Sequence, residues 1–121
     1  MADEPESHYR AHLFSKDVHN RAIQLLKQHL TPEQREQFEK RGHFYVAGGN
    51  SARLYRIRHG VQMNVEQLDR SGKRIRVLCF MPKGGLAAGD VMLAQKVALE
   101  LYETEALQIA NTMPALEALL G

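Results

Sequence analysis

The chain has one cysteine, Cys79, among its 121 residues, so an intrachain disulfide is excluded. A lone cysteine favours a reducing compartment. The chain also lacks the roughly 18 consecutive apolar residues that a membrane-spanning helix needs. Its start, residues 1–6, is acidic and has no apolar run behind a basic end, so a secretory signal is not expected. The sequence therefore predicts a cytoplasmic protein that does not enter a membrane.

No segment matches a motif for catalysis or for cofactor binding. Residues 83–85, Lys-Gly-Gly, fit the spacing of neither phosphate-loop motif, GxxxxGK[ST] or GxGxxG. His8 and His12 are spaced like two metal ligands on one helix face, but no cysteine or carboxylate cluster completes a site. Cys79 is expected in the core, and no Ser/His/acid or Cys/His set has a recognisable local context. We therefore expect a non-enzymatic protein without a metal or a cofactor.

The composition is that of an ordinary globular protein, with 44% hydrophobic and 25% charged residues. Its length is typical of one domain. Residues 1–14 have no clear apolar period, so we expect a flexible N-terminal segment there. Residues 15–121 are expected to fold as a single α+β domain.

Helix signals stand at both ends of this domain. Ser15 is a candidate cap for a helix over residues 16–30. Thr31 and Pro32 predict a second helix start, because Gln34 stands where a capping box closes. This helix is expected to end near Arg41, with Gly42 in the left-handed position that follows many helices.

A long C-terminal helical region is also expected. Asp90 is the candidate N-cap of a helix over residues 91–102, which continues or restarts after Thr104 and runs to Asn111. Pro114 is suited to open a last short helix. The expected buried side of the first helix is Leu93, Ala94, Val97, Ala98 and Leu101.

Between the helices the sequence predicts an antiparallel β-meander of three to four strands. The expected strands are 43–47, 53–58, 61–69 and 73–81. Residues 58–60 and 70–72 each form a three-residue loop ending in glycine, which is typical of a hairpin with a G1 bulge. These loops predict a register that pairs Ile57 with Val61 and Val65 with Val77.

That register sorts the side chains onto two faces. The apolar face is Tyr55, Ile57, Val61, Met63, Val65, Ile75, Val77, Cys79 and Met81. The other face is Leu54, Arg56, Arg58, Gln62, Asn64, Glu66, Leu68, Arg74, Arg76, Leu78 and Phe80. A one-residue slip would scramble both sets.

Charge is unevenly distributed along the chain. Residues 52–83 hold eight basic and two acidic side chains, whereas residues 84–121 hold one basic and five acidic ones. Guanidinium groups on a rigid sheet can bind carboxylates or phosphates with paired hydrogen bonds. The candidate partner-binding residues are Arg56, Arg58, Arg70, Lys73, Arg74 and Arg76.

These residues predict a small binding or regulatory protein whose partner is an acidic protein surface or a nucleic acid. The competing interpretation is a solvated sheet face, with Glu66 opposite Arg76 as an ordinary pair or with the acidic C-terminal helix neutralising the arginines.

An alternative function is that of a structural or protein-interaction subunit, such as a homo-oligomer or a phage-encoded inhibitor. It would act through an exposed strand edge or through Met113, Leu116, Leu119 and Leu120. The stretches Tyr55-Arg56-Ile57-x-x-Gly60-x-x-x-Asn64-Val65 and Ala94-Gln95-Lys96-x-Ala98-Leu99-Glu100, with Cys79, resemble uncharacterised small bacterial and phage proteins over residues 31–111. The resemblance implies a bacterial or phage origin and no particular activity.

Overall fold

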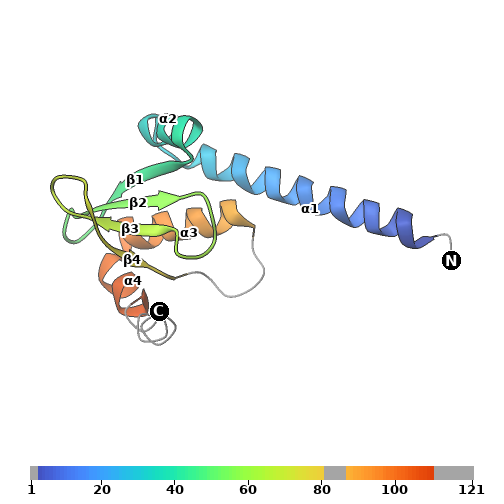
Figure 1. Ribbon diagram of the computed structural model, residues 1–121. Helices are drawn as coiled ribbons and strands as arrows, with labels where there is room; N and C mark the ends of the chain where they lie inside the picture. Colours follow the sequence, from blue (N-terminus) through green and yellow to red (C-terminus); the bar gives the residue numbers. More distant parts are fainter. Residues whose placement is uncertain (1–2, 81–86, 111–121) are drawn as a thin grey trace.

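The computed structural model describes residues 3–80 and 87–110, with side chains from Ser15 onward. Its elements are α1 (Asp3–Gln28), α2 (Pro32–Arg41), β1 (His43–Ala47), β2 (Leu54–Arg58), β3 (Val65–Leu68), β4 (Arg74–Leu78), α3 (Ala88–Leu101) and α4 (Glu103–Ala110). The four strands form one antiparallel sheet in the order β1-β2-β3-β4, which confirms the predicted α+β meander between helices. Helix α2 lies beside β1, and α1 projects from the body of the molecule (Figure 1). Among the described residues, no helix combines the length and apolar character needed to cross a membrane.

Helix α1 begins at Asp3, so the backbone of residues 3–14, predicted as a flexible segment, is helical. Once a helix is nucleated, each further residue adds one hydrogen bond, and the packed end of α1 supplies the nucleus. That end lies against α3, where a Cβ added to Gly89 would stand 2.4 Å from the carbonyl group of Ala22. Close packing of two backbones therefore anchors α1.

Helix α2 follows the sequence prediction. The Thr31 hydroxyl accepts the Gln34 N–H at 3.1 Å, and the Gln34 side chain accepts the Thr31 N–H at 3.1 Å, which completes the capping box. Gly42 ends the helix with φ +72°. The same helix holds the outer edge of β1, since Gln34 Nε2 donates to the Tyr45 carbonyl at 2.8 Å and Gln37 Oε1 accepts the Tyr45 N–H at 3.0 Å.

Strand β1 and the turn after it lie where the sequence predicts, but the first hairpin does not. Ile57 pairs with Val65 rather than Val61, and residues 59–64 form the connection in place of a three-residue loop. The cause is Asn64, whose buried amide donates to the Arg58 carbonyl at 3.1 Å and to Gln95 of α3 at 2.8 Å. These bonds hold residue 64 in the loop instead of releasing it to the strand.

The second hairpin keeps its predicted turn, with Gly72 at φ +86°, but its register is shifted by one residue. Gln67 lies opposite Arg76 rather than Ile75, because a bulge falls between Gln67 and Leu68. The shift turns β4 over, so Leu78, predicted on the polar face, is in the core. Ile75, predicted on the apolar face, is 58% exposed.

Helix α3 covers the apolar sheet face, but with a different side from the predicted one. Its buried residues are Gly89, Val91, Met92, Gln95, Lys96 and Leu99. Leu101, predicted in the core, is 67% exposed. Ala87, not Asp90, is the N-cap, and Asp90 lies in the first turn.

The core joins this helix to the sheet and to the first two helices. Its largest members include Leu26, Phe38, Phe44, Tyr55, Ile57, Val65, Leu78, Met92 and Leu99. The chain breaks its helix at Tyr102 and restarts as α4. The helix predicted from Pro114 and the glycines of residues 83–85 lie outside the described residues.

Candidate functional site: the arginine surface

Three arginines surround one buried carboxylate on the sheet face opposite α3. Glu66 has a side chain only 3% exposed, and Arg56 Nε lies 2.6 Å from its Oε1. Arg74 Nη1 lies 3.4 Å from Oε2, and Arg58 Nη1 lies 3.8 Å from Oε1. We call Arg56, Arg58, Arg74 and Glu66 the arginine surface.

The strand pairing of the sheet creates this cluster. Arg56 lies directly across from Glu66, so its guanidinium bonds to the neighbouring strand. Arg58 lies two residues further along β2 and so projects from the same face. Arg74 reaches Glu66 from β4 because it lies opposite Leu68, on this same face, between the turn and the bulge.

The charge state of the cluster follows from these contacts. The hydrogen bond from Arg56 lowers the pKa of the Glu66 carboxyl, and the charges of Arg56 and Arg58 lower it further, against an opposing effect of burial. Glu66 is therefore ionised at neutral pH. Three positive groups face one negative group, and the side chains of Arg58 and Arg74 are 57% and 59% exposed. Each guanidinium has five N–H donors, so both retain donors for a partner.

His43 lies at the border of this surface, across from Arg58 in β1. Burial lowers the pKa of its imidazole, and the charges of Arg56, Arg41 and Arg58 lower it further. His43 is therefore neutral at pH 7. Its Nε2 is buried without a hydrogen-bond partner in the described structure.

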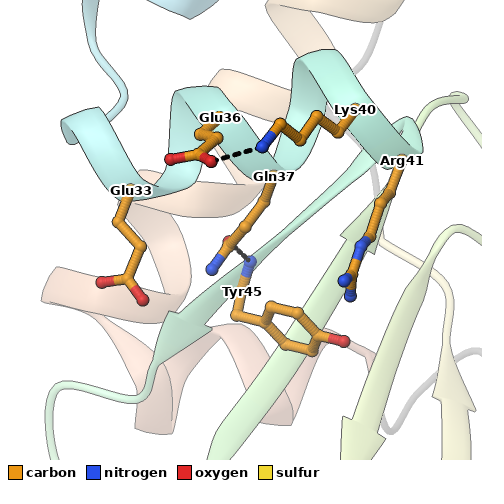
Figure 2. A pocket seen from close by; sticks show the side chains of 6 residues that line it. All are labelled: Glu33, Glu36, Gln37, Lys40, Arg41 and Tyr45. Carbon is orange, nitrogen blue, oxygen red and sulfur yellow. Dashed lines mark hydrogen bonds and ion pairs between the residues drawn. The ribbon is translucent and has the colours of Figure 1, made fainter.

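A polar hollow of about 300 Å³ lies between α2 and β1. Figure 2 shows its lining, Glu33, Glu36, Gln37, Lys40, Arg41 and Tyr45. Lys40 Nζ pairs with Glu36 Oε1 at 2.6 Å, and Gln37 is bonded to the backbone of β1. Three of the six lining side chains are thus engaged within the seam between helix and sheet.

The structure separates the six predicted partner-binding residues into two groups. Arg56, Arg58 and Arg74 come together as predicted. Arg76 projects from the opposite face, where its Nε donates to Gln67 Oε1 at 2.8 Å. Arg70 and Lys73 are exposed at the β3–β4 turn. The prediction that all four strand arginines share one face is therefore wrong, and the one-residue register shift is the reason.

The acid that pairs with the arginines is Glu66, which the competing interpretation named, but its strand partner differs from the predicted one. Glu66 pairs with Arg56 instead of Arg76. Two acidic residues of the described C-terminal helices are engaged elsewhere, since Glu100 pairs with Lys96 and Glu103 binds the turn after β1. The apolar residues of the alternative prediction, Met113, Leu116, Leu119 and Leu120, lie outside the described residues.

A surface hollow with a volume of about 700 Å³ adjoins the β3–β4 turn. It is lined by Ser51, Ala52, Arg53, Leu54, Gln67, Leu68, Asp69, Arg70 and Ile75. Two of its side chains are arginines, and two others, Leu54 and Ile75, are apolar groups 38% and 58% exposed. Positive charge and apolar surface therefore lie side by side at this end of the sheet.

Sequence reasoning missed Glu103, which is 1% exposed. Its Oε1 accepts the N–H groups of Asn50 and Ser51 at 2.9 and 2.8 Å. Its Oε2 accepts the Ser51 and Tyr55 hydroxyls, each at 2.6 Å. These partners are 48 to 53 positions away in the chain, so no local pattern indicates them.

Within residues 15–80 and 87–110, no group of three His, Cys, Asp or Glu side chains could hold a metal ion. The side chains of His8 and His12 lie outside the described residues, and Cys79 is a half-buried free thiol.

Comparison with family models, curated proteins and solved structures finds no match.

Proposed function

We propose that this chain is a non-catalytic binding module that engages an acidic partner through the arginine surface. The observation that carries the proposal is the imbalance around Glu66. One buried carboxylate faces three guanidinium groups, and two of these are more than half exposed. An acidic group from outside would complete the charge balance that the fold leaves open.

Glu66 also gives the surface a fixed geometry. By holding Arg56 at 2.6 Å it orients one guanidinium on the rigid sheet. Fixed guanidinium groups lose less rotamer freedom on binding than free side chains do, which favours planar recognition of carboxylate or phosphate. The two exposed arginines at its sides are then placed to meet a partner spread along the sheet.

The test uses fluorescence anisotropy with two labelled probes, an oligoglutamate peptide and a single-stranded oligonucleotide. The double variant R58A/R74A should weaken binding of the preferred probe by roughly tenfold to a hundredfold, since a charge-assisted hydrogen bond contributes about 1.5–3 kcal/mol. Wild-type binding should fall as salt rises. These two arginines are suitable because their removal leaves the Glu66–Arg56 pair intact.

Arg21 supplies the matched control. Its side chain is 80% exposed and pairs with Asp17 on α1, away from the sheet. R21A removes one exposed arginine without touching the arginine surface, so it should leave binding nearly unchanged. Failure of both probes to bind at low salt, or equal losses in the control and in the double variant, would refute the proposal.

A further inference from the structure

The two edges of the sheet differ in how they are covered. At β1, two glutamines of α2 bond the outward backbone groups of Tyr45. Strand β4 lies at the other edge, away from α2 (Figure 1). Unpaired edge strands are the usual template for adding a further strand.

Hydrogen-bond alternation shows which groups of β4 point outward. The Arg58 N–H donates to the Asn64 carbonyl at 2.7 Å, so the even-numbered residues of β3 bond to β2. Val65 and Gln67 then bond toward β4, where they pair with Leu78 and Arg76. Val77, between those two, directs its N–H and carbonyl away from the sheet. No described segment covers these two backbone groups of Val77.

Charge selects the kind of strand that fits this edge. Residues 70–80 contain four basic side chains and no acidic one. The bulge places Arg74 on one face of β4 and Arg76 on the other, so positive charge flanks the edge on both sides. Acidic residues of an incoming strand would pair with them across the strand boundary. The exposed Ile75 offers an apolar contact between them.

Two other occupants fit less well. A second copy of the chain pairing β4 antiparallel with β4 through Val77 would place Arg76 of one copy diagonally across from Arg76 of the other, and this like-charge contact is unfavourable. A nucleic acid would meet the positive charge but has no peptide N–H and carbonyl ladder to pair with Val77.

We infer that β4 accepts an extended acidic protein segment as a fifth strand of the sheet. This inference rests on the proposed function, because Arg74 belongs to the arginine surface. It adds the mode of binding, in which backbone pairing at Val77 gives the register and the arginines select an acidic sequence.

The experiment uses the full chain and a peptide of about seven glutamate and valine residues, which spans β4 with one residue beyond each end. Amide hydrogen exchange at Val77 should slow at least ~10-fold when the peptide is bound, because its N–H becomes paired. A second peptide, N-methylated at alternate amides along the pairing edge, should bind at least ~10-fold more weakly.

A pair of variants at one position supplies the control. V77P removes the outward N–H, which an edge strand tolerates, and should weaken peptide binding. V77A keeps the N–H and should bind nearly as wild type does. If V77P does not fold, the N-methylated peptide on the wild-type chain still tests the ladder.

The outcomes separate this inference from the proposed function. Suppose that R58A/R74A weakens peptide binding, but that bound peptide does not slow hydrogen exchange at Val77 and N-methylation does not weaken binding. Strand addition is then wrong, and the arginine surface remains a binding site. If neither the peptide nor an oligonucleotide binds at low salt, both fail. If Val77 becomes protected without peptide as protein concentration rises, the occupant is a second copy and the inference is overturned.

Discussion

Removing the Glu103 side chain is the most informative perturbation of this fold. Glu103 connects the first turn of α4 to the turn after β1 through three hydrogen bonds and to Tyr55 of β2 through a fourth. The space is tight, since a Cβ added to Gly48 would lie 2.2 Å from Glu103 Oε2. The carboxylate therefore fills a cradle that is shaped for it.

The expected magnitude follows from what each donor can do afterwards. Asn50 and Ser51 are exposed, so water can replace the carboxylate for their N–H groups, whereas Tyr55 is fully buried. Leaving one buried donor unpaired costs about 1–3 kcal/mol, and the lost charge-assisted bonds add to this. We expect E103A to lower the free energy of unfolding by about 3 kcal/mol. For a domain of this size that corresponds to a decrease in Tm of roughly 10 °C.

The pH dependence gives a second readout. Burial raises the pKa of the Glu103 carboxyl, but the bonds from Ser51, Tyr55 and Asn50 together outweigh it, so the pKa lies below its usual 4.5. A lowered pKa contributes stability that is present above the unfolded-state value and is lost as pH falls through the folded-state value. E103Q should therefore reduce the loss of stability below about pH 4.5.

The assay is urea denaturation of wild type, E103A, E103Q and E105A at several pH values. Glu105 is the control because it is exposed in the same helix. A double-mutant cycle of E103Q with Y55F should give a coupling energy of about 1 kcal/mol. If E103A is no more destabilising than E105A, or if the cycle is additive, the described cradle does not hold α4 to the sheet.

Three further predictions concern the same scaffold. Gln95 exchanges hydrogen bonds with Asn64 and donates to the Phe80 carbonyl, so Q95L should lower the free energy of unfolding by about 2 kcal/mol. In the Q95L chain, adding N64L should lower that free energy by less than N64L does in the wild-type chain. In thermal melts, E66Q should flatten the loss of stability below about pH 4.5, because the Arg56 hydrogen bond lowers the pKa of this carboxyl. G89A should destabilise by about 2 kcal/mol in urea, because its Cβ would meet backbone atoms that cannot move aside.

The parts of the fold predicted from sequence are those that depend on neighbouring residues. The start of α2 is determined by Thr31, Pro32 and Gln34, and its end by Gly42. Four nearby residues are therefore enough to predict both ends of this helix. The β3–β4 turn is likewise local, since Asp69 Oδ1 accepts the N–H groups of Ser71 and Lys73. Such signals act within one turn and need no knowledge of the rest of the chain.

The parts that could not be predicted depend on buried polar groups with distant partners. Asn64 looks like a polar strand residue, yet its bond to Gln95, 31 positions away, keeps it in a loop. Gln95 and Lys96 look like the exposed side of α3, yet both are buried because Asn64 and Glu100 satisfy them. A prediction from hydrophobic periodicity places such polar residues on the solvent side. The buried side predicted for α3 was therefore turned away from the observed one.

At the candidate site, the charge content could be predicted from the sequence, but the face on which each charge lies could not. The excess of arginine over acid in residues 52–83 is visible in the sequence, and three of the predicted residues do meet at Glu66. The place of Arg76 depends on one bulge, for which the regular alternation of β4 gives no signal. A single extra residue in a strand exchanges its faces, so the charge content was predictable and its distribution was not.

That bulge also connects the fold to the proposed binding mode. A regular hairpin would place Arg74 and Arg76 on one face of β4 and leave the other face of the edge without charge. The bulge divides them, so that each face of the edge carries one guanidinium. In an antiparallel copy paired through Val77, Arg76 of each strand would lie diagonally across from Arg76 of the other on the same face, and this like-charge contact disfavours self-pairing. The irregularity that defeats a simple prediction of register thus leaves the edge suited to an acidic strand.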